Sequence, residues 1–132
     1  MVKFTKKEID FLKENEACRI ATSHNDIPHV APVTYYFGDG YFYIATDYET
    51  RKYSNLKKNN KAALSVDIYK AGKHKAVIIQ GAIEIIEKGS EFMRLYEIFY
   101  KKFSWVKQMP WKEGEAPFIK IKPKTKTSWG LN

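Results

Sequence analysis

The residues whose types and spacing most clearly suggest a binding site are Thr50, Arg51 and Lys52, which are consecutive at a predicted helix start. Threonine is a favoured N-cap, but the first helical turn favours acids because its free amide groups carry partial positive charge. Two cations there become favourable if an anion binds, and a phosphate would meet both side chains, the amides and the Thr50 hydroxyl. The sequence therefore predicts an anion site at 50–52, with Thr46 upstream as a further hydroxyl. The alternative is a pair of solvated cations on a short surface helix.

Other chemical motifs are missing from the sequence. It contains no Gly-rich phosphate loop, His-Glu-x-x-His, Cys-x-x-Cys or nucleophile elbow. His24 and His29 flank a predicted turn and could face each other across a hairpin, but two imidazoles without a third ligand make a poor metal site. Cys18 lies within a predicted strand and is expected to be a small buried apolar residue. We expect no metal site, and the sequence assigns no catalytic residue.

Length and composition predict one globular domain spanning residues 1–132. The chain has 132 residues, of which 44% are hydrophobic and 29% charged. A single cysteine excludes an intramolecular disulfide and favours a reducing compartment. No apolar stretch approaches the roughly 20 residues of a membrane helix, and the N-terminus lacks a signal-peptide segment. We therefore expect a cytoplasmic protein without a membrane segment.

The positive charge raises the question of nucleic-acid binding. Lys and Arg number 23 against 15 acids, a net charge of +8, yet the only arginines are Arg19, Arg51 and Arg94. Because arginine supplies the bidentate contacts of sequence-reading proteins, this composition argues against nucleic acid and favours a solvated lysine surface. The lysines at 120, 122, 124 and 126 alternate along a predicted strand, which places them all on one face.

The elements that must position residues 50–52 are predicted to be short strands joined by tight turns. A capping box of Thr5 and Glu8 begins the first helix, and Ser90 is predicted to cap a helix ending near Phe103. The segment 75–86 is almost continuously apolar, so it is expected to be a central strand buried on both faces. The predicted helices are 5–15, 50–58 and 90–103, the predicted strands are 17–24, 28–37, 41–46, 61–69, 75–86 and a closing pair at 117–123 and 125–130, and 104–117 is predicted to be irregular. This pattern favours a mainly β protein, an antiparallel barrel of six or seven strands with two or three peripheral helices.

Four segments, in order along the chain, resemble the FMN-binding split β-barrel family typified by pyridoxamine 5′-phosphate oxidase. The segment 19–37 is similar to the family's first hairpin. The segment 43–66 resembles its Thr, Ser-Arg-Lys, Asn-Asn and strand pattern, with Thr50 in place of the serine. A strand ending at Gln80-Gly81 and a closing Pro123-to-Trp129 element complete the match.

The resemblance implies a six- to seven-stranded Greek-key split barrel that forms a homodimer with FMN at the interface. Arg51 and Lys52 would hold the flavin phosphate, helped by Thr50. Ala45 and Thr46 would contact the ribityl phosphate. The isoalloxazine ring would be lined by Val30, Ala31, Pro32, Val33 and Thr34, with Trp129 packed nearby. The implied function is a flavin-dependent oxidoreductase acting on a small, unidentified substrate.

Departures from the family pattern leave the substrate open. The residues after Trp129 lack the Arg-x-His element that pyridoxamine phosphate oxidases use on their substrate, and Thr34 replaces a basic residue that contacts the flavin. Two alternatives on the same fold are a deazaflavin-dependent reductase and a flavin-storing module without turnover. A third is a basic barrel that stacks single-stranded nucleic acid on Tyr35, Tyr41 or Tyr43.

Overall fold

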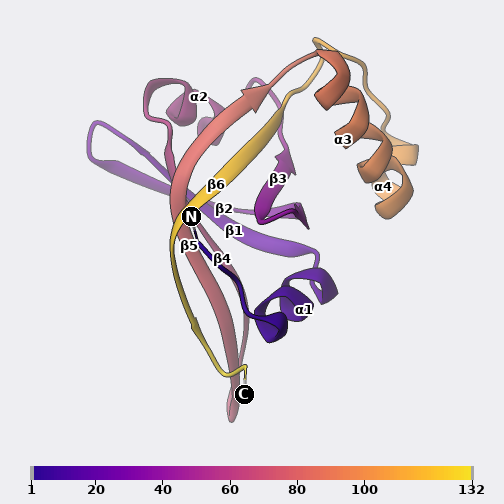
Figure 1. The fold of residues 1–132 in the computed structure, drawn as a ribbon. Coiled ribbons are helices and arrows are strands. Elements are labelled where there is room, and N and C mark those ends of the chain that lie inside the picture. Colours follow the sequence, from indigo (N-terminus) through magenta and orange to yellow (C-terminus); the bar gives the residue numbers. More distant parts are fainter. Residues whose placement is uncertain (1, 132) are drawn as a thin grey trace.

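The computed structural model describes residues 2–131, which form a closed barrel of six antiparallel strands with four helices around it (Figure 1). Around the barrel the strands follow the order β1-β2-β3-β6-β5-β4, so β4 returns to lie beside β1, as in a Greek key. The strands are β1 (Ala17–His24), β2 (Ile27–Gly38), β3 (Tyr41–Ala45), β4 (Lys61–Lys70), β5 (Lys73–Ile86) and β6 (Phe118–Trp129). The helices are α1 (Lys6–Glu14), α2 (Arg51–Lys58), α3 (Gly89–Lys102) and α4 (Ser104–Gln108).

Two tight turns set the register of the first three strands. Asn25 and Asp26 have φ angles of 53° and 62°, and Asp39 and Gly40 have 54° and 85°. Positive φ at both central residues is the type I′ geometry, which matches the twist of paired strands. The turns join β1 to β2 and β2 to β3 as antiparallel hairpins, in agreement with the predicted short strands and tight turns. Their registers fix which side chains of β2 point into the barrel.

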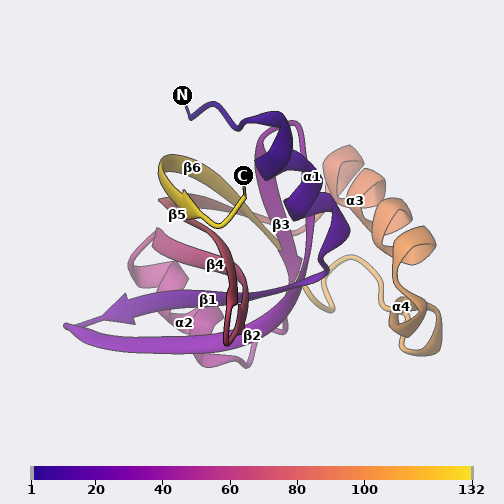
Figure 2. The same ribbon diagram turned by 90° about the horizontal axis from the view of Figure 1, so that it is seen from below.

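The barrel has an apolar core inside it and a second apolar core against its outer wall. Inward residues such as Ile20, Leu64 and Ile121 form the first core, and residues of α1 and α2 pack against it. Phe118 and Tyr43, from β6 and β3, pack outward against α3 and α4, with Phe92, Leu95, Phe99, Phe103 and Val106. Figure 2 shows α3 and α4 together on one flank of the barrel. The outward side chain of Tyr36 packs against this second core, whereas Val30, earlier on the same face of β2, remains exposed.

The predicted capping box of α1 is present, and it also joins the helix to β6. The Thr5 amide donates to Glu8 Oε1 (2.7 Å), and the Glu8 amide donates to the Thr5 hydroxyl (3.2 Å). Lys126 Nζ donates to Glu8 Oε1 (2.6 Å), and the Ser128 hydroxyl donates to Glu8 Oε2. Burial alone would raise the pKa of Glu8, but these hydrogen bonds outweigh it and lower that pKa to about 2.

The prediction of a closing strand pair is wrong, because residues 118–129 form one strand with a β-bulge. Gly81 of β5 pairs with Pro123, whereas Gln80 pairs with Thr125, so Lys124 is the extra residue. One inserted residue shifts the alternation of side chains. Lys126 therefore points toward α1 and Glu8, and the tail lysines do not share one face as predicted. Gly81 also lies within β5 and does not end a strand.

Three local predictions also need correction. The segment 104–117 contains the short helix α4, so it is only partly irregular. Helix α3 begins at Gly89 after Lys88 and has no side-chain cap, so Ser90 is not its N-cap. Strand β5 is buried mainly on the face that lines the barrel, since Gln80 and Glu84 on the other face are exposed. None of the helices between residues 2 and 131 has the length and apolar character needed to cross a membrane.

Candidate functional site

The candidate site is built at the start of α2, where β3 ends. Thr50 is the N-cap, as predicted, and its hydroxyl accepts from the Tyr53 amide (3.3 Å) and donates to the Asp47 carbonyl (2.9 Å). The hydroxyls of Thr46 and Thr50 are 3.1 Å apart. The structure therefore brings Thr46 and Thr50 together and holds the first turn of the helix rigidly beside the end of β3.

Arg51 and Lys52 occupy the first turn as two cations without an acidic partner. None of the ion pairs within residues 2–131 involves either side chain. Lys52 is half-buried, and loss of water around its ammonium lowers its pKa, although the negative charge of Asp47 acts in the opposite direction. A bound anion would compensate this partly desolvated charge.

The backbone adds donors to the same place. Arg51 and Lys52 are the first two residues of the helix, so their amides have no acceptor within it. These amides, the helix dipole and the two cations together suit a phosphate group. The residues present therefore fit the phosphate of a nucleotide-like cofactor, with the Thr50 hydroxyl engaged in capping the helix.

The predicted ring-lining residues lie on β2, where they alternate between its two faces. Val33 packs against the barrel core and Ala31 shares its face, so both side chains point away from the outer face of β2. Val30, Pro32 and Thr34 face outward; Val30 is 65% exposed. Tyr35, the residue after Thr34, pairs with Ile44, the residue before Ala45. The outer face of β2 thus leads to the end of β3 and toward α2.

Trp129 is not near this site within one chain. It lies at the end of β6, pairs with Ala76 and is 44% exposed. Ala76 also pairs with Asp67, six residues along β4 from Lys61, a separation of roughly 20 Å along the barrel. Figure 1 shows the C-terminus and α2 at opposite ends of the molecule. The structure brings together the predicted residues of β2, β3 and α2, but not Trp129.

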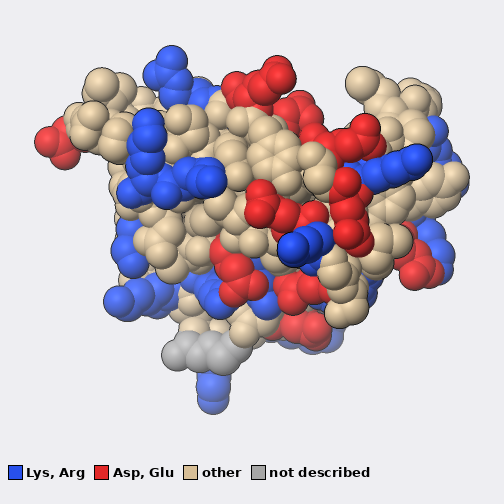
Figure 3. Space-filling model, turned by 90° about the horizontal axis from the view of Figure 1, so that it is seen from above, with Lys and Arg blue, Asp and Glu red and all other residues tan. Residues whose placement is uncertain are grey.

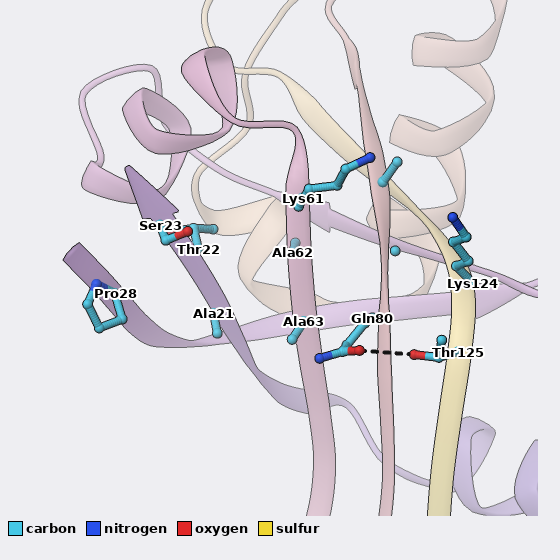
Figure 4. A pocket seen from close by; sticks show the side chains of 12 residues that line it. Ala21, Thr22, Ser23, Pro28, Lys61, Ala62, Ala63, Gln80, Lys124 and Thr125 are labelled. Carbon is cyan, nitrogen blue, oxygen red and sulfur yellow. Dashed lines mark hydrogen bonds between the residues drawn. The ribbon is translucent and has the colours of Figure 1, made fainter. Parts of the chain in front are cut away.

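A groove of about 470 Å³ crosses the outer face of β1, β4, β5 and β6, and the sequence did not indicate it (Figure 4). Small residues, Ala21, Ala63 and Ala82, contribute to its lining. Lys61 and Lys124 lie on the two sides of β5, and the Thr125 hydroxyl donates to Gln80 (3.2 Å). This groove depends on the bulge in β6 and on the barrel closing, neither of which was visible in the sequence pattern.

A second cleft, of about 530 Å³, lies between the end of β3 and the α4 region, and the sequence reasoning also missed it. It is lined by Ala45, Thr46, Asp47, Trp105, Met109, Pro110, Trp111, Glu115 and Ala116. The only available signal was the concentration of tryptophan and proline in 105–111. The cleft shares Ala45 and Thr46 with the site at the start of α2.

The histidines do not form a metal site. His29 pairs with Thr22 and His24 with Ile27, so the two histidines are offset along the hairpin and not opposite each other. Across the part of the chain that the structure describes, no group of three or more His, Cys, Asp or Glu side chains is placed to hold a metal ion. Cys18 is buried, and burial raises the pKa of its thiol to about 12, which makes it unreactive.

Comparison with known proteins identifies the family. The family model described as "Pyridoxamine 5'-phosphate oxidase" matches residues 4–130, nearly the whole barrel. The chain belongs to the pyridoxamine 5′-phosphate oxidase family. The resemblance found in the sequence is therefore confirmed, as is the split β-barrel fold. Among curated protein sequences, none matches this chain significantly.

Solved structures with the fold of the pyridoxamine 5′-phosphate oxidase family differ in what they bind. General Stress Protein 26 from Bacillus anthracis is 18% identical, with a TM-score of 0.76 over 96% of this chain and 94% of its own. A FAD-binding protein from Mesorhizobium loti is 20% identical (TM-score 0.73, 95% and 94%). HutZ, the heme storage protein from Vibrio cholerae, is 14% identical (TM-score 0.80, 95% and 93%). At these identities the likeness concerns the fold alone.

Proposed function

We propose that this protein is an FMN-dependent oxidoreductase that binds the cofactor phosphate at the start of α2. The observation that carries the proposal is the pair Arg51 and Lys52, two cations in the first turn of a helix that has no acidic residue in that turn. The leading amides of the helix have no acceptor within it. Membership of a family named for a flavin enzyme's activity supports it, as does the FAD-binding relative of the same fold.

The rest of the cofactor extends from this phosphate along the outer face of β2. Val30, Pro32 and Thr34 offer an exposed, mostly apolar strip beside Ala45, which suits a planar ring system. Backbone groups along this strip fix the orientation of the ring, and Thr46 stands between strip and phosphate. FMN supplies hydride and electron transfer when bound, and the chain binds, orients and tunes it.

The proposal includes a homodimer, because Trp129 cannot reach this strip within one chain. In a two-fold dimer each flavin site would receive Trp129 of the partner subunit. Its indole, which is partly exposed at the end of β6, would become buried against the partner subunit in such a dimer. The proposed substrate is a small, unidentified molecule.

The test compares FMN with riboflavin, which lacks the phosphate. The double substitution Arg51→Ala/Lys52→Ala is expected to weaken FMN binding by several kcal/mol, because each charge-assisted hydrogen bond contributes about 1.5–3 kcal/mol. Riboflavin binding should be weak and nearly unchanged by it. Lys57→Ala/Lys58→Ala, which removes two cations from the other end of the same helix, is the matched control. Equal losses for FMN and riboflavin would contradict the assignment.

The absorption spectrum of the purified protein separates the remaining alternatives. The cofactor's electronics set flavin bands near roughly 370 and 450 nm and a single deazaflavin band near roughly 420 nm. Turnover of the loaded protein with nicotinamide donors distinguishes an oxidoreductase from a flavin-storing module. A chain that takes up neither cofactor would contradict both flavin and deazaflavin binding. Base stacking on Tyr35 or Tyr43 is not supported either, because the structure buries both side chains.

A further inference from the structure

The cleft between β3 and α4 has walls suited to a flat aromatic ligand. The indoles of Trp105 and Trp111 are parallel within 5°, with ring centroids 6.0 Å apart, and Met109 and Pro110 add apolar surface. Trp105 is 37% exposed, although it stacks on Phe103 behind it. Exposed indole surface held in fixed orientation is a recognition feature, because its electron-rich face attracts cations and planar rings.

The charged residues that line this cleft are both acids, in a chain whose net charge is +8. Asp47 and Glu115 take part in none of the ion pairs found within residues 2–131. Figure 3 shows acidic side chains gathered on the face seen from above, despite the basic composition. An electron-rich wall with two carboxylates at its rim selects against anions and favours a cation.

The acidic rim is held in place by hydrogen bonds. Glu115 Oε1 accepts from the Lys112 amide (2.7 Å), and the Glu115 amide donates to the Lys112 carbonyl (3.0 Å), which fixes the turn and leaves Oε2 free. The Asp47 carbonyl accepts from the Thr50 amide and hydroxyl (3.3 and 2.9 Å). Asp47 is therefore tied to the N-cap of α2, and its acidic side chain lies on the same loop as the proposed phosphate site.

We propose that this cleft binds a small planar aromatic cation, of the N-alkylpyridinium class, and is the substrate pocket of the protein. The volume of about 530 Å³ accommodates a one- or two-ring molecule. The cation lies against Trp105, with its charge toward Asp47 and Glu115. Ala45 and Thr46 form the wall shared with the phosphate site. The name "substrate pocket" rests on the proposed flavin function, whereas the preference for an aromatic cation rests on the cleft itself.

The experiment titrates the full-length protein with 1-methylnicotinamide, a planar cation, and with nicotinate, an anion of similar size. Calorimetry and tryptophan fluorescence should show saturable binding of the cation, at least about tenfold tighter than nicotinate. Trp105→Ala should abolish most of the fluorescence change. Asp47→Asn/Glu115→Gln should weaken the cation about tenfold while leaving binding of neutral nicotinamide unchanged. Gln at position 115 keeps the acceptor for the Lys112 amide, so the turn is preserved.

Glu113→Gln is the matched control, since Glu113 is exposed in the same turn but does not line the cleft. Equal affinities for cation and anion, or no effect of either Trp105→Ala or the carboxylate substitutions, would overturn the proposal. FMN binding is measured on the same samples. Cation binding without FMN binding would support the aromatic-cation pocket and contradict the flavin function. FMN binding without cation binding would support the flavin function and contradict the aromatic-cation pocket.

Discussion

At the scale of single residues, Glu8 shows how one side chain can serve two elements. The capping box was predictable because Thr5 and Glu8 are three residues apart. The contacts of Glu8 with Lys126 and Ser128 were not, since they join residues about 120 positions apart and depend on the bulge in β6. The site at Arg51 and Lys52 was predictable from neighbouring residues alone. The helix start is a local feature, and two cations there contradict the preference of a first helical turn for acids.

The lowered pKa of Glu8 predicts acid-labile stability. A carboxylate with a folded pKa of about 2 and a reference value of 4.5 contributes stability above pH 4.5, which is lost as the pH falls toward 2. The contribution is about 3 kcal/mol. Glu8→Gln should cost roughly this amount at pH 7 and little at pH 2, as measured by urea unfolding. Glu14→Gln, on the exposed side of α1, is the control. A constant difference between wild type and Glu8→Gln across this range would contradict the prediction.

At the scale of elements, the strands before residue 90 were well predicted and the later segments less so. Tight turns and alternating side chains define β1, β2 and β3 locally. Strand β6 was divided in two because Pro123 and Lys124 interrupt its alternation, and only pairing with β5 shows that the interruption is a bulge. Helix α4 was missed because its five residues are stabilised by Val106 and Trp111 packing outside the barrel.

The bulge predicts a specific intolerance at Gly81. A Cβ there would lie 1.9 Å from the Lys122 carbonyl oxygen, a backbone atom that cannot move without disturbing the β5–β6 pairing. Gly81→Ala should therefore destabilise the barrel by about 3 kcal/mol or more in chemical denaturation. Gly72→Ala, at a turn with φ of 77° and open space around it, should cost only about 1 kcal/mol. Equal costs for the two substitutions would show that the close approach at Gly81 is relieved easily.

At the scale of the whole molecule, the fold was predictable and the completed site was not. The hairpins of the barrel could be predicted from turn residues and from the alternation of side chains along each strand. The resemblance to the family then indicated that these strands close into a barrel. The distance between Trp129 and α2 follows from pairing across β4, β5 and β6, which no local pattern contains. Only with the barrel closed does it become clear that a site using both Arg51 and Trp129 must draw them from different chains.

This geometry makes a prediction about mixed dimers. One chain carries Arg51→Ala/Lys52→Ala and the other Trp129→Ala, each with a different affinity tag. If each site takes its cations from one chain and its tryptophan from the other, the purified heterodimer has one intact site and one doubly altered site. FMN titration should then give one site of wild-type affinity per heterodimer, whereas neither altered homodimer has any. Sedimentation should show the flavin-loaded protein as a dimer at micromolar concentration. If both contacts came from the same chain, every site in the heterodimer would carry one defect, and no wild-type site would appear.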